Sequence, residues 1–114
     1  MDQATALAYA QKYAEEVIKE LNPEQIIIFG SYAADNAKEE SDIDIAVIFN
    51  GFDGDFLRVS SWLWSLTWKI SSYIEPILLD KGHDKSGFVS DIMRTGKLIY
   101  QKERMRDERS ITAI

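Results

Sequence analysis

Two short apolar segments, joined by a loop that starts with Gly-Ser and ends with Asp-x-Asp, constrain the fold of this chain more than any other feature. The first segment, residues 26–29, is mostly β-branched and is followed directly by Gly30 and Ser31. The second segment, residues 41–49, reads S-D-I-D-I-A-V-I-F and alternates with a period of two. Both segments are typical of strands, and a connection of about a dozen residues allows them to pair antiparallel.

Antiparallel pairing would gather the chemically useful residues at one end of the sheet. Gly30 and Ser31 end the first strand and Asp42 and Asp44 begin the second, so the two pairs become neighbours. The alternation places both aspartates on one face of the sheet and the larger apolar side chains on the other. A long helix then leads to a third strand, which a crossover connection returns parallel to the second. Glu75, near the start of that third strand, would lie level with the aspartates.

Hydrophobic periodicity and turn residues predict the remaining elements. The predicted helices cover residues 3–21, 56–71 and 87–95, with N-caps at Asp2, at Asp53 or Asp55, and at Ser86, and a short helix over residues 31–37 is also permitted. Residues 73–79 are predicted to form a strand, and residues 97–100 a last strand or a docked segment. Pro76 indicates an edge strand or a bulge, because proline cannot donate to a strand ladder.

This order of elements indicates an α/β (α+β) fold, in which helices pack on a small mixed β-sheet. A chain of 114 residues has the length of one domain. We expect that domain to cover residues 1–100 and to be followed by a charged tail over residues 101–114.

Charge and composition argue against several functional classes. The net charge of −6 argues against binding to duplex nucleic acid, which depends on Lys and Arg, but allows a nucleotide bound with metal ions. The chain has no cysteine, so neither disulfides nor thiolate metal sites are expected. It has no apolar run of 18 residues and no secretory signal at its N-terminus. We therefore expect no membrane association and a cytoplasmic location.

The gathered residues suit nucleotidyl transfer. Gly30 allows the backbone to approach a phosphate, and Ser31 with the following amides offers hydrogen-bond donors to phosphate oxygens. Asp42 and Asp44 suit Mg²⁺, which binds carboxylates together with substrate phosphates. Two such ions would stabilise the attacking and leaving oxygens of an in-line displacement. Glu75 would complete the second metal site or accept the proton of the attacking hydroxyl.

Each feature also has a purely structural interpretation. An Asp-x-Asp pair is weak evidence alone, since residues 53–55 contain a second one that suits a turn and a helix cap. Glu75 would otherwise be a surface acid on an edge strand, and Tyr32 either shapes the mouth of the pocket or packs. The tryptophans of the second long helix are best explained by core or interface packing. Trp64 and Trp68 share one face of that helix, and Trp62 lies on another.

The pattern G-S-Y-A-x-x-x-A-x-x-x-S-D-I-D, with an acid opening the next strand, resembles the nucleotidyltransferase superfamily that includes DNA polymerase beta. The short form is similar to the minimal nucleotidyltransferases of prokaryotes, and so is the ending I-M-R-T-G-K-L-I-Y. The resemblance implies Mg²⁺-dependent transfer of a nucleoside monophosphate from a triphosphate. It also implies a partner: members of this group commonly act as antitoxins of HEPN-domain toxins, and some attach AMP to a tyrosine of the toxin.

One departure from the family pattern bears on activity. The family usually has Arg-Gly after G-S-x-A, whereas this chain has Ala34-Asp35, which makes the pocket more negative. Lys38, in the same loop, would compensate. We therefore expect nucleotide contacts from Gly30, Ser31, Tyr32 and Lys38.

The sequence leaves three hypotheses open. The first is an adenylyltransferase acting on a partner toxin, with ATP as the nucleoside triphosphate and Asp42, Asp44 and Glu75 as metal ligands and catalytic groups. The second is a catalytically weak or inactive module that neutralises its partner by forming a homo- or hetero-oligomeric complex. The third, transfer to a small molecule, needs an acceptor pocket that so short a chain has little length to build.

Overall fold

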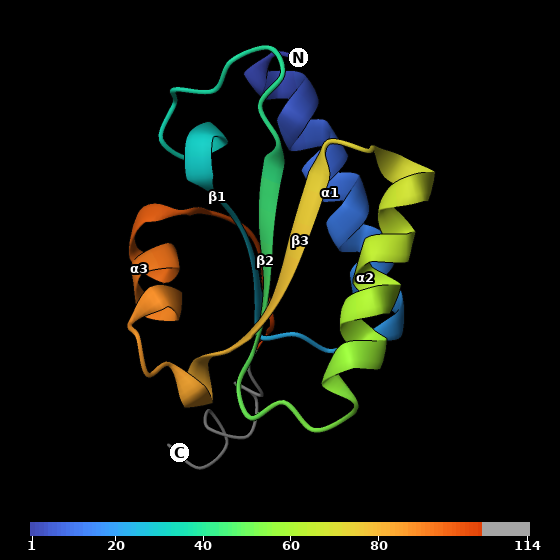
Figure 1. The fold of residues 1–114 in the computed structure, drawn as a ribbon, viewed down its shortest axis with the longest axis vertical. Coiled ribbons are helices and arrows are strands. Elements are labelled where there is room, and N and C mark those ends of the chain that lie inside the picture. The colour runs from blue at the N-terminus through green and yellow to red at the C-terminus, as the bar shows by residue number, and fades with distance from the viewer. Residues whose placement is uncertain (104–114) are drawn as a thin grey trace, which may run out of the picture.

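The structure, a computed structural model, describes residues 1–103 as a four-stranded sheet with three α-helices (Figure 1). The elements follow one another as α1 (Gln3–Glu20), β1 (Gln25–Phe29), η1 (Gly30–Tyr32), β2 (Ile43–Phe49), α2 (Phe56–Ile70), β3 (Ile74–Asp80), η2 (Lys81–His83), α3 (Phe88–Thr95) and β4 (Lys97–Gln101). Here η denotes a single turn of 3-10 helix. The predicted helices and strands are all present, with ends that differ from the prediction by one or two residues.

The strand order is β3-β2-β1-β4, and the sheet is mixed as expected. β1 is antiparallel to both β2 and β4, whereas β2 and β3 are parallel and joined through α2. Pro76 lies in β3, an edge strand, where its missing N–H does not interrupt a central ladder. Residues 97–100 form part of a true strand, β4, which extends to Gln101.

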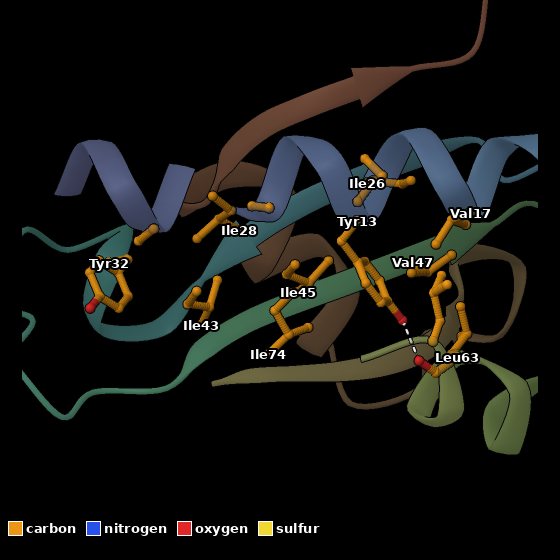
Figure 2. Packing of buried hydrophobic residues seen from close by; sticks show 14 of the residues in the cluster. Tyr13, Val17, Ile26, Ile28, Tyr32, Ile43, Ile45, Val47, Leu63 and Ile74 are labelled. Atoms are coloured by element: carbon orange, nitrogen blue, oxygen red, sulfur yellow. Dashed lines mark hydrogen bonds between the residues drawn. The ribbon is translucent and has the colours of Figure 1, made fainter. Parts of the chain in front are cut away.

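Helices cover the two faces of the sheet unequally. α1 and α2 lie on one face, over the larger core, and the shorter α3 lies on the other (Figure 1). Figure 2 shows the larger core, in which Ile43, Ile45 and Val47 of β2 point toward the helices. Tyr13 of α1 joins this core and donates a hydrogen bond to the carbonyl of Leu63 in α2, at 2.7 Å. The alternate residues of β2 therefore face α3 and the uncovered part of the sheet.

Two of the predicted helix caps are confirmed and one is wrong. Asp2 and Asp55 accept hydrogen bonds from backbone amides in the first turns of α1 and α2. Ser86 was expected to cap α3, but the N-cap residue is Gly87, and the carboxylate of Asp84 accepts from the amides of Val89 and Ser90 at 2.9 and 3.0 Å. Ser86 accepts a longer bond, at 3.3 Å, from Phe88.

The short helix permitted over residues 31–37 is also limited to one turn. It covers Gly30–Tyr32, and residues 33–35 continue as a turn.

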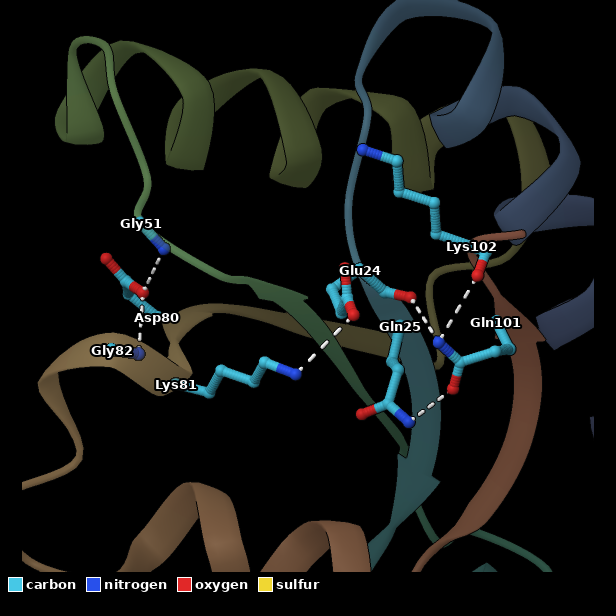
Figure 3. Close-up of polar contacts among 8 residues, drawn as sticks. All are labelled: Glu24, Gln25, Gly51, Asp80, Lys81, Gly82, Gln101 and Lys102. Carbon is cyan, nitrogen blue, oxygen red and sulfur yellow. Dashed lines mark hydrogen bonds and ion pairs between the residues drawn. The ribbon is translucent and has the colours of Figure 1, made fainter. Parts of the chain in front are cut away.

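At the end of the sheet where β1 begins, polar contacts join the strand termini (Figure 3). The Asp80 carboxylate, at the end of β3, accepts from the amides of Gly51, Phe52 and Gly82 at 2.8–2.9 Å. The amide of Lys102 donates to the carbonyl of Glu24 at 2.8 Å. The first residues of the predicted C-terminal tail thus continue the sheet edge, and residues 104–114 lie outside the described part of the chain.

Among residues 1–103, no helix combines the length and apolarity needed to cross a bilayer.

Candidate active site

The structure brings Asp44 and Glu75 side by side at the end of the sheet opposite to Asp80. They are register partners on the parallel strands β2 and β3, and Asp44 is also paired with Phe29, the last residue of β1. Asp42 lies two residues before Asp44, just outside β2. Ala46 and its register partner Ile77 lie two residues after Asp44 and Glu75, and both pack in the smaller core under α3. Because side chains two residues apart share a face of a strand, the acids lie on the face that α3 partly covers.

Gly30 provides the space that the Asp44 carboxylate occupies. A Cβ built on Gly30 would lie 2.2 Å from Oδ2 of Asp44, well inside van der Waals contact. Gly30 also has a φ of +73°, a conformation that other residues adopt only with strain. The glycine that sequence analysis assigned to phosphate approach therefore also allows the chain to turn directly over a carboxylate.

Partial loss of solvent and neighbouring carboxylates raise the pKa values of Asp44 and Glu75. The pKa of Asp44 is raised, first by burial and also by the charge of Asp42, while a hydrogen bond with Glu75 opposes the increase. Glu75 is exposed on the edge strand β3. Its pKa is raised, first by loss of solvent around the carboxyl and then by the charges of Asp42 and Asp44 and by hydrogen bonds with them. Carboxylates held together in this way repel one another when ionised, and a divalent cation would relieve that repulsion.

The donor set fits a hard divalent cation, although it is not a preformed metal cage. Within the described residues, no three acidic or histidine side chains converge closely enough to hold an ion. Mg²⁺ commonly takes one or two carboxylates together with substrate phosphates and water, so it does not need a complete protein cage. Asp42, Asp44 and Glu75 are the candidates, of which one or two would hold such an ion together with oxygens of the nucleotide.

The other residues predicted to contact the nucleotide, Ser31, Tyr32 and Lys38, differ in how exposed they are. Ser31 is half-buried in η1, and the exposed Lys38 lines a depression of about 440 Å³ with Glu39, Glu40 and Ser41, directly before Asp42. The side chain of Tyr32 is only 1% exposed and packs in the larger core. Its hydroxyl donates to the carbonyl of Met1 at 3.3 Å.

Tyr32 therefore packs inward, which is one of the two roles considered for it, and its ring does not reach the surface on which the carboxylates lie.

Sequence analysis missed one contact at the turn after η1. Nζ of Lys97, at the start of β4, lies 3.0 Å from Oδ1 of Asp35. Asp35 stands where the family usually has the glycine of Arg-Gly. Its φ of +57° is the left-handed backbone conformation that glycine adopts most readily. The pairing of a lysine and an aspartate 62 residues apart leaves no signal in a single sequence.

A comparison with protein families decides the wider assignment. The family described as Polymerase beta, Nucleotidyltransferase matches residues 11–105, which is most of the chain. The chain belongs to the polymerase beta nucleotidyltransferase family. Among the matched residues of this nucleotidyltransferase-family chain are Gly30, Ser31 and all three acids.

Solved structures share the nucleotidyltransferase fold. A crystal structure of a candidate nucleotidyltransferase from Sulfolobus solfataricus is 26% identical, with a TM-score of 0.67 over 90% of this chain and 86% of that one. A crystal structure described as a toxin-antitoxin with AMP-PNP is 20% identical, with a TM-score of 0.60 over 90% of this chain and 81% of that one. No curated protein matches this nucleotidyltransferase-family sequence significantly.

Proposed function

We propose that this protein transfers a nucleoside monophosphate, AMP from ATP, onto a hydroxyl group in a Mg²⁺-dependent reaction. The observation that carries the proposal is the register pairing of Asp44 with Glu75, beside a turn in which Gly30 leaves room for the Asp44 carboxylate. Two neighbouring carboxylates and an open backbone turn are the parts that metal-assisted phosphoryl chemistry needs.

In the proposed reaction, the acceptor oxygen attacks the α-phosphorus and the bond to pyrophosphate breaks. Asp42 and Asp44 hold the divalent metal, which supplies charge stabilisation to the phosphate oxygens when it is bound. Glu75 is a further ligand or accepts the proton of the attacking hydroxyl, and its raised pKa makes it a better base than an ordinary glutamate. Gly30 and Ser31 position the triphosphate through the backbone of η1, and Lys38 adds a positive charge from the loop.

We further propose that the acceptor is a tyrosine of a partner protein, a HEPN-domain toxin, which this protein neutralises. The support comes from α2, whose outward face exposes Leu57, Trp64 and Trp68, with exposed fractions of 76%, 47% and 90%. With Ser61, these residues follow the spacing i, i+4, i+7 and i+11 on the side of α2 that faces away from Leu63 and Leu66. A helix that is apolar on both faces is expected to be covered by another protein.

The test is transfer of label in a purified system. The protein is incubated with Mg²⁺, ATP labelled on its α-phosphate, and the protein encoded by the adjacent gene, and label on the partner is measured. We expect label with ATP and none with the Asp44→Asn variant. If none of the four nucleoside triphosphates, each labelled on its α-phosphate, transfers label to the partner, the transferase activity is refuted.

A second candidate function is neutralisation by binding alone. Ala34 and Asp35, at positions where the family usually has Arg-Gly, favour it because the turn itself lacks a basic side chain. On this hypothesis Asp42→Asn should leave neutralisation of the partner intact in a growth assay. Loss of protection by this variant, with the complex still formed, would exclude binding alone.

A further inference from the structure

We propose that Gln3, the first residue of α1, is a positioning residue for the turn at Gly30 and Ser31 that would bind the triphosphate. This inference rests on the proposed nucleotide site and adds to it a residue from outside its sequence motif. It starts from a hydrogen bond that Nε2 of Gln3 donates to the carbonyl oxygen of Tyr32, at 2.9 Å, between residues 29 positions apart.

Gln3 holds the peptide group that closes η1. A peptide group is planar, so the carbonyl of Tyr32 and the amide of Ala33 belong to one rigid unit. Gln3 binds this unit at its carbonyl, and the amide of the same unit donates to the carbonyl of Gly30 at 3.1 Å. The direction of the Gly30 carbonyl therefore depends on where Gln3 holds the following part of the turn.

The Gly30 carbonyl in turn sets the direction of the Ser31 amide. These two groups belong to the preceding rigid peptide unit, in which the C=O and N–H bonds point in opposite directions. Because the carbonyl is directed at Ala33, the amide of Ser31 points away from the closed turn. None of the hydrogen bonds that join residues 1–103 is donated by this amide. It is therefore available to a phosphate oxygen, and Gln3 controls its direction through two linked peptide groups.

The turn needs support from outside because its own residues restrict it weakly. Gly30 is conformationally the most permissive residue type, and η1 is a single 3-10 turn, whose hydrogen-bond geometry is poorer than that of an α-helix. The buried ring of Tyr32 fixes one end of the turn in the larger core. Gln3 adds the contact that fixes the backbone of the turn itself.

The same part of the chain also contacts the second arm of the loop between η1 and β2. The backbone nitrogen of Met1 donates to the carbonyl of Glu39 at 3.1 Å, three residues before Asp42. The carbonyl of Met1 accepts from the hydroxyl of Tyr32 at 3.3 Å. Met1 and Gln3 thus join the arm that carries the phosphate-binding turn to the arm that leads to the carboxylates.

The test replaces Gln3 by a side chain of similar shape that cannot donate a hydrogen bond. Gln3 is exposed, so Gln3→Met should leave the melting temperature of the full-length protein nearly unchanged. We expect it to weaken binding of ATP with Mg²⁺ about 5-fold, the effect of one neutral hydrogen bond, and binding of AMP less than about 2-fold. Calorimetry measures these affinities. Gln11→Met, at another exposed position of α1, is the matched control and should change neither.

A second measurement does not depend on the nucleotide. The amides of Ala33 and Ala34 both donate to the Gly30 carbonyl, so their hydrogen exchange, followed by NMR, reports opening of the turn. We expect exchange of both amides to be about 5-fold faster in Gln3→Met than in the wild type and in Gln11→Met, because loss of the same hydrogen bond favours opening by the same factor.

Three results would overturn the proposal: unchanged ATP affinity of Gln3→Met, an equal loss of affinity for ATP and AMP, or exchange at Ala33 and Ala34 no faster than in the wild type. A wild type that does not bind ATP would overturn it together with the proposed nucleotide site. The transferase activity can fail separately: a wild type that binds ATP in a way that depends on Gln3, but labels no partner, would refute that activity while the positioning role stands.

Discussion

Gly30 and Asp44 show how closely single residues depend on one another in this site. The glycine has a positive φ and also lies where a Cβ would collide with Oδ2 of Asp44. Backbone conformation and space are therefore two separate requirements at one position. Gly51 has a φ of +79°, but nothing lies within 4 Å of its would-be Cβ, so the chain contains an internal control that separates these requirements.

We predict that Gly30→Ala and Gly51→Ala each lower the free energy of unfolding by about 1–2 kcal/mol, the cost of a left-handed residue with a side chain. Gly30→Ala alone should also weaken Mg²⁺-dependent ATP binding, because the new methyl group displaces the Asp44 carboxylate. Urea denaturation and calorimetry measure the two effects. Equal ATP affinity for the two variants would show that the Gly30–Asp44 contact has no role in binding.

The raised pKa of Asp44 leads to a second prediction at the residue scale. A carboxyl whose pKa is raised on folding contributes its full stability below its unfolded value and loses it as pH rises through the folded value. Ionised Asp44 therefore destabilises the metal-free protein at neutral pH. Asp44→Asn should raise the melting temperature at pH 8, and the difference should shrink as pH falls toward 4.

Mg²⁺ provides the complementary measurement for Asp44. An ion bound only by the folded state raises the melting temperature of the wild type, and it should have a smaller effect on Asp44→Asn. Asp91→Asn, on the exposed surface of α3, is the control and should respond to Mg²⁺ like the wild type. A melting temperature of metal-free Asp44→Asn at or below that of the wild type at pH 8 would contradict the destabilising role of the carboxylate.

At the scale of elements, the loops at the two ends of the sheet are organised by different means. At the end where β1 begins, Asp80 joins the loop after β2 to the turn after β3 by accepting hydrogen bonds from three backbone amides. Figure 3 shows two of them, from Gly51 and Gly82. These amides, with Gly51 the largest contributor, lower the pKa of Asp80 to about 2. At the carboxylate end, the loop between η1 and β2 is long and is joined to β4 through Lys97. The first end is a structural connection, and the second carries the proposed chemistry.

We therefore predict that Asp80→Asn lowers the free energy of unfolding by about 1–2 kcal/mol at neutral pH, because three backbone amides lose a charged acceptor. A carboxyl whose pKa is lowered on folding contributes stability above its unfolded value of about 4 and loses it as pH falls toward 2. The difference between wild type and variant should therefore shrink over that range. Asp53→Asn, in the adjoining turn, serves as the control, and a pH-independent difference would contradict the assignment.

At the scale of the whole molecule, the sheet separates two surfaces with different proposed roles. The carboxylates and the turn at Gly30 belong to the face that α3 partly covers, whereas α2 lies on the opposite face of the sheet (Figure 1). The side of α2 that carries Trp64 and Trp68 is exposed. Partner binding and nucleotide binding should therefore be separable by mutation, even though the partner is also the proposed acceptor.

We predict that the double variant Leu57→Ser and Trp68→Ser weakens the complex with the proposed HEPN-domain partner at least 10-fold while ATP affinity stays unchanged. Asp42→Asn should show the reverse pattern. Affinities are measured by calorimetry, with Ser65→Ala as a control on an exposed position of the same helix. A partner that binds the double variant with wild-type affinity would exclude α2 as the docking surface.

The sequence by itself determined the layer architecture and the location of the candidate site. Alternation in residues 41–49 set the two faces of β2, Gly30 marked the end of β1, and the helical period of residues 56–70 required a crossover to β3. These signals are local: they follow from backbone preferences and from the burial of one face, and both are encoded by neighbours in the chain.

Only the tertiary structure decided which distant groups meet. Asp84 rather than Ser86 accepts from the amides of Val89 and Ser90, because a loop turns the more distant carboxylate toward the first helical amides. Trp68 faces outward and Tyr32 inward, because helix orientation against the sheet selects one side of each segment. Lys97 reaches Asp35 only because β4 pairs with β1 in one register. Such contacts depend on register and packing across the whole sheet, which no short stretch of this sequence specifies.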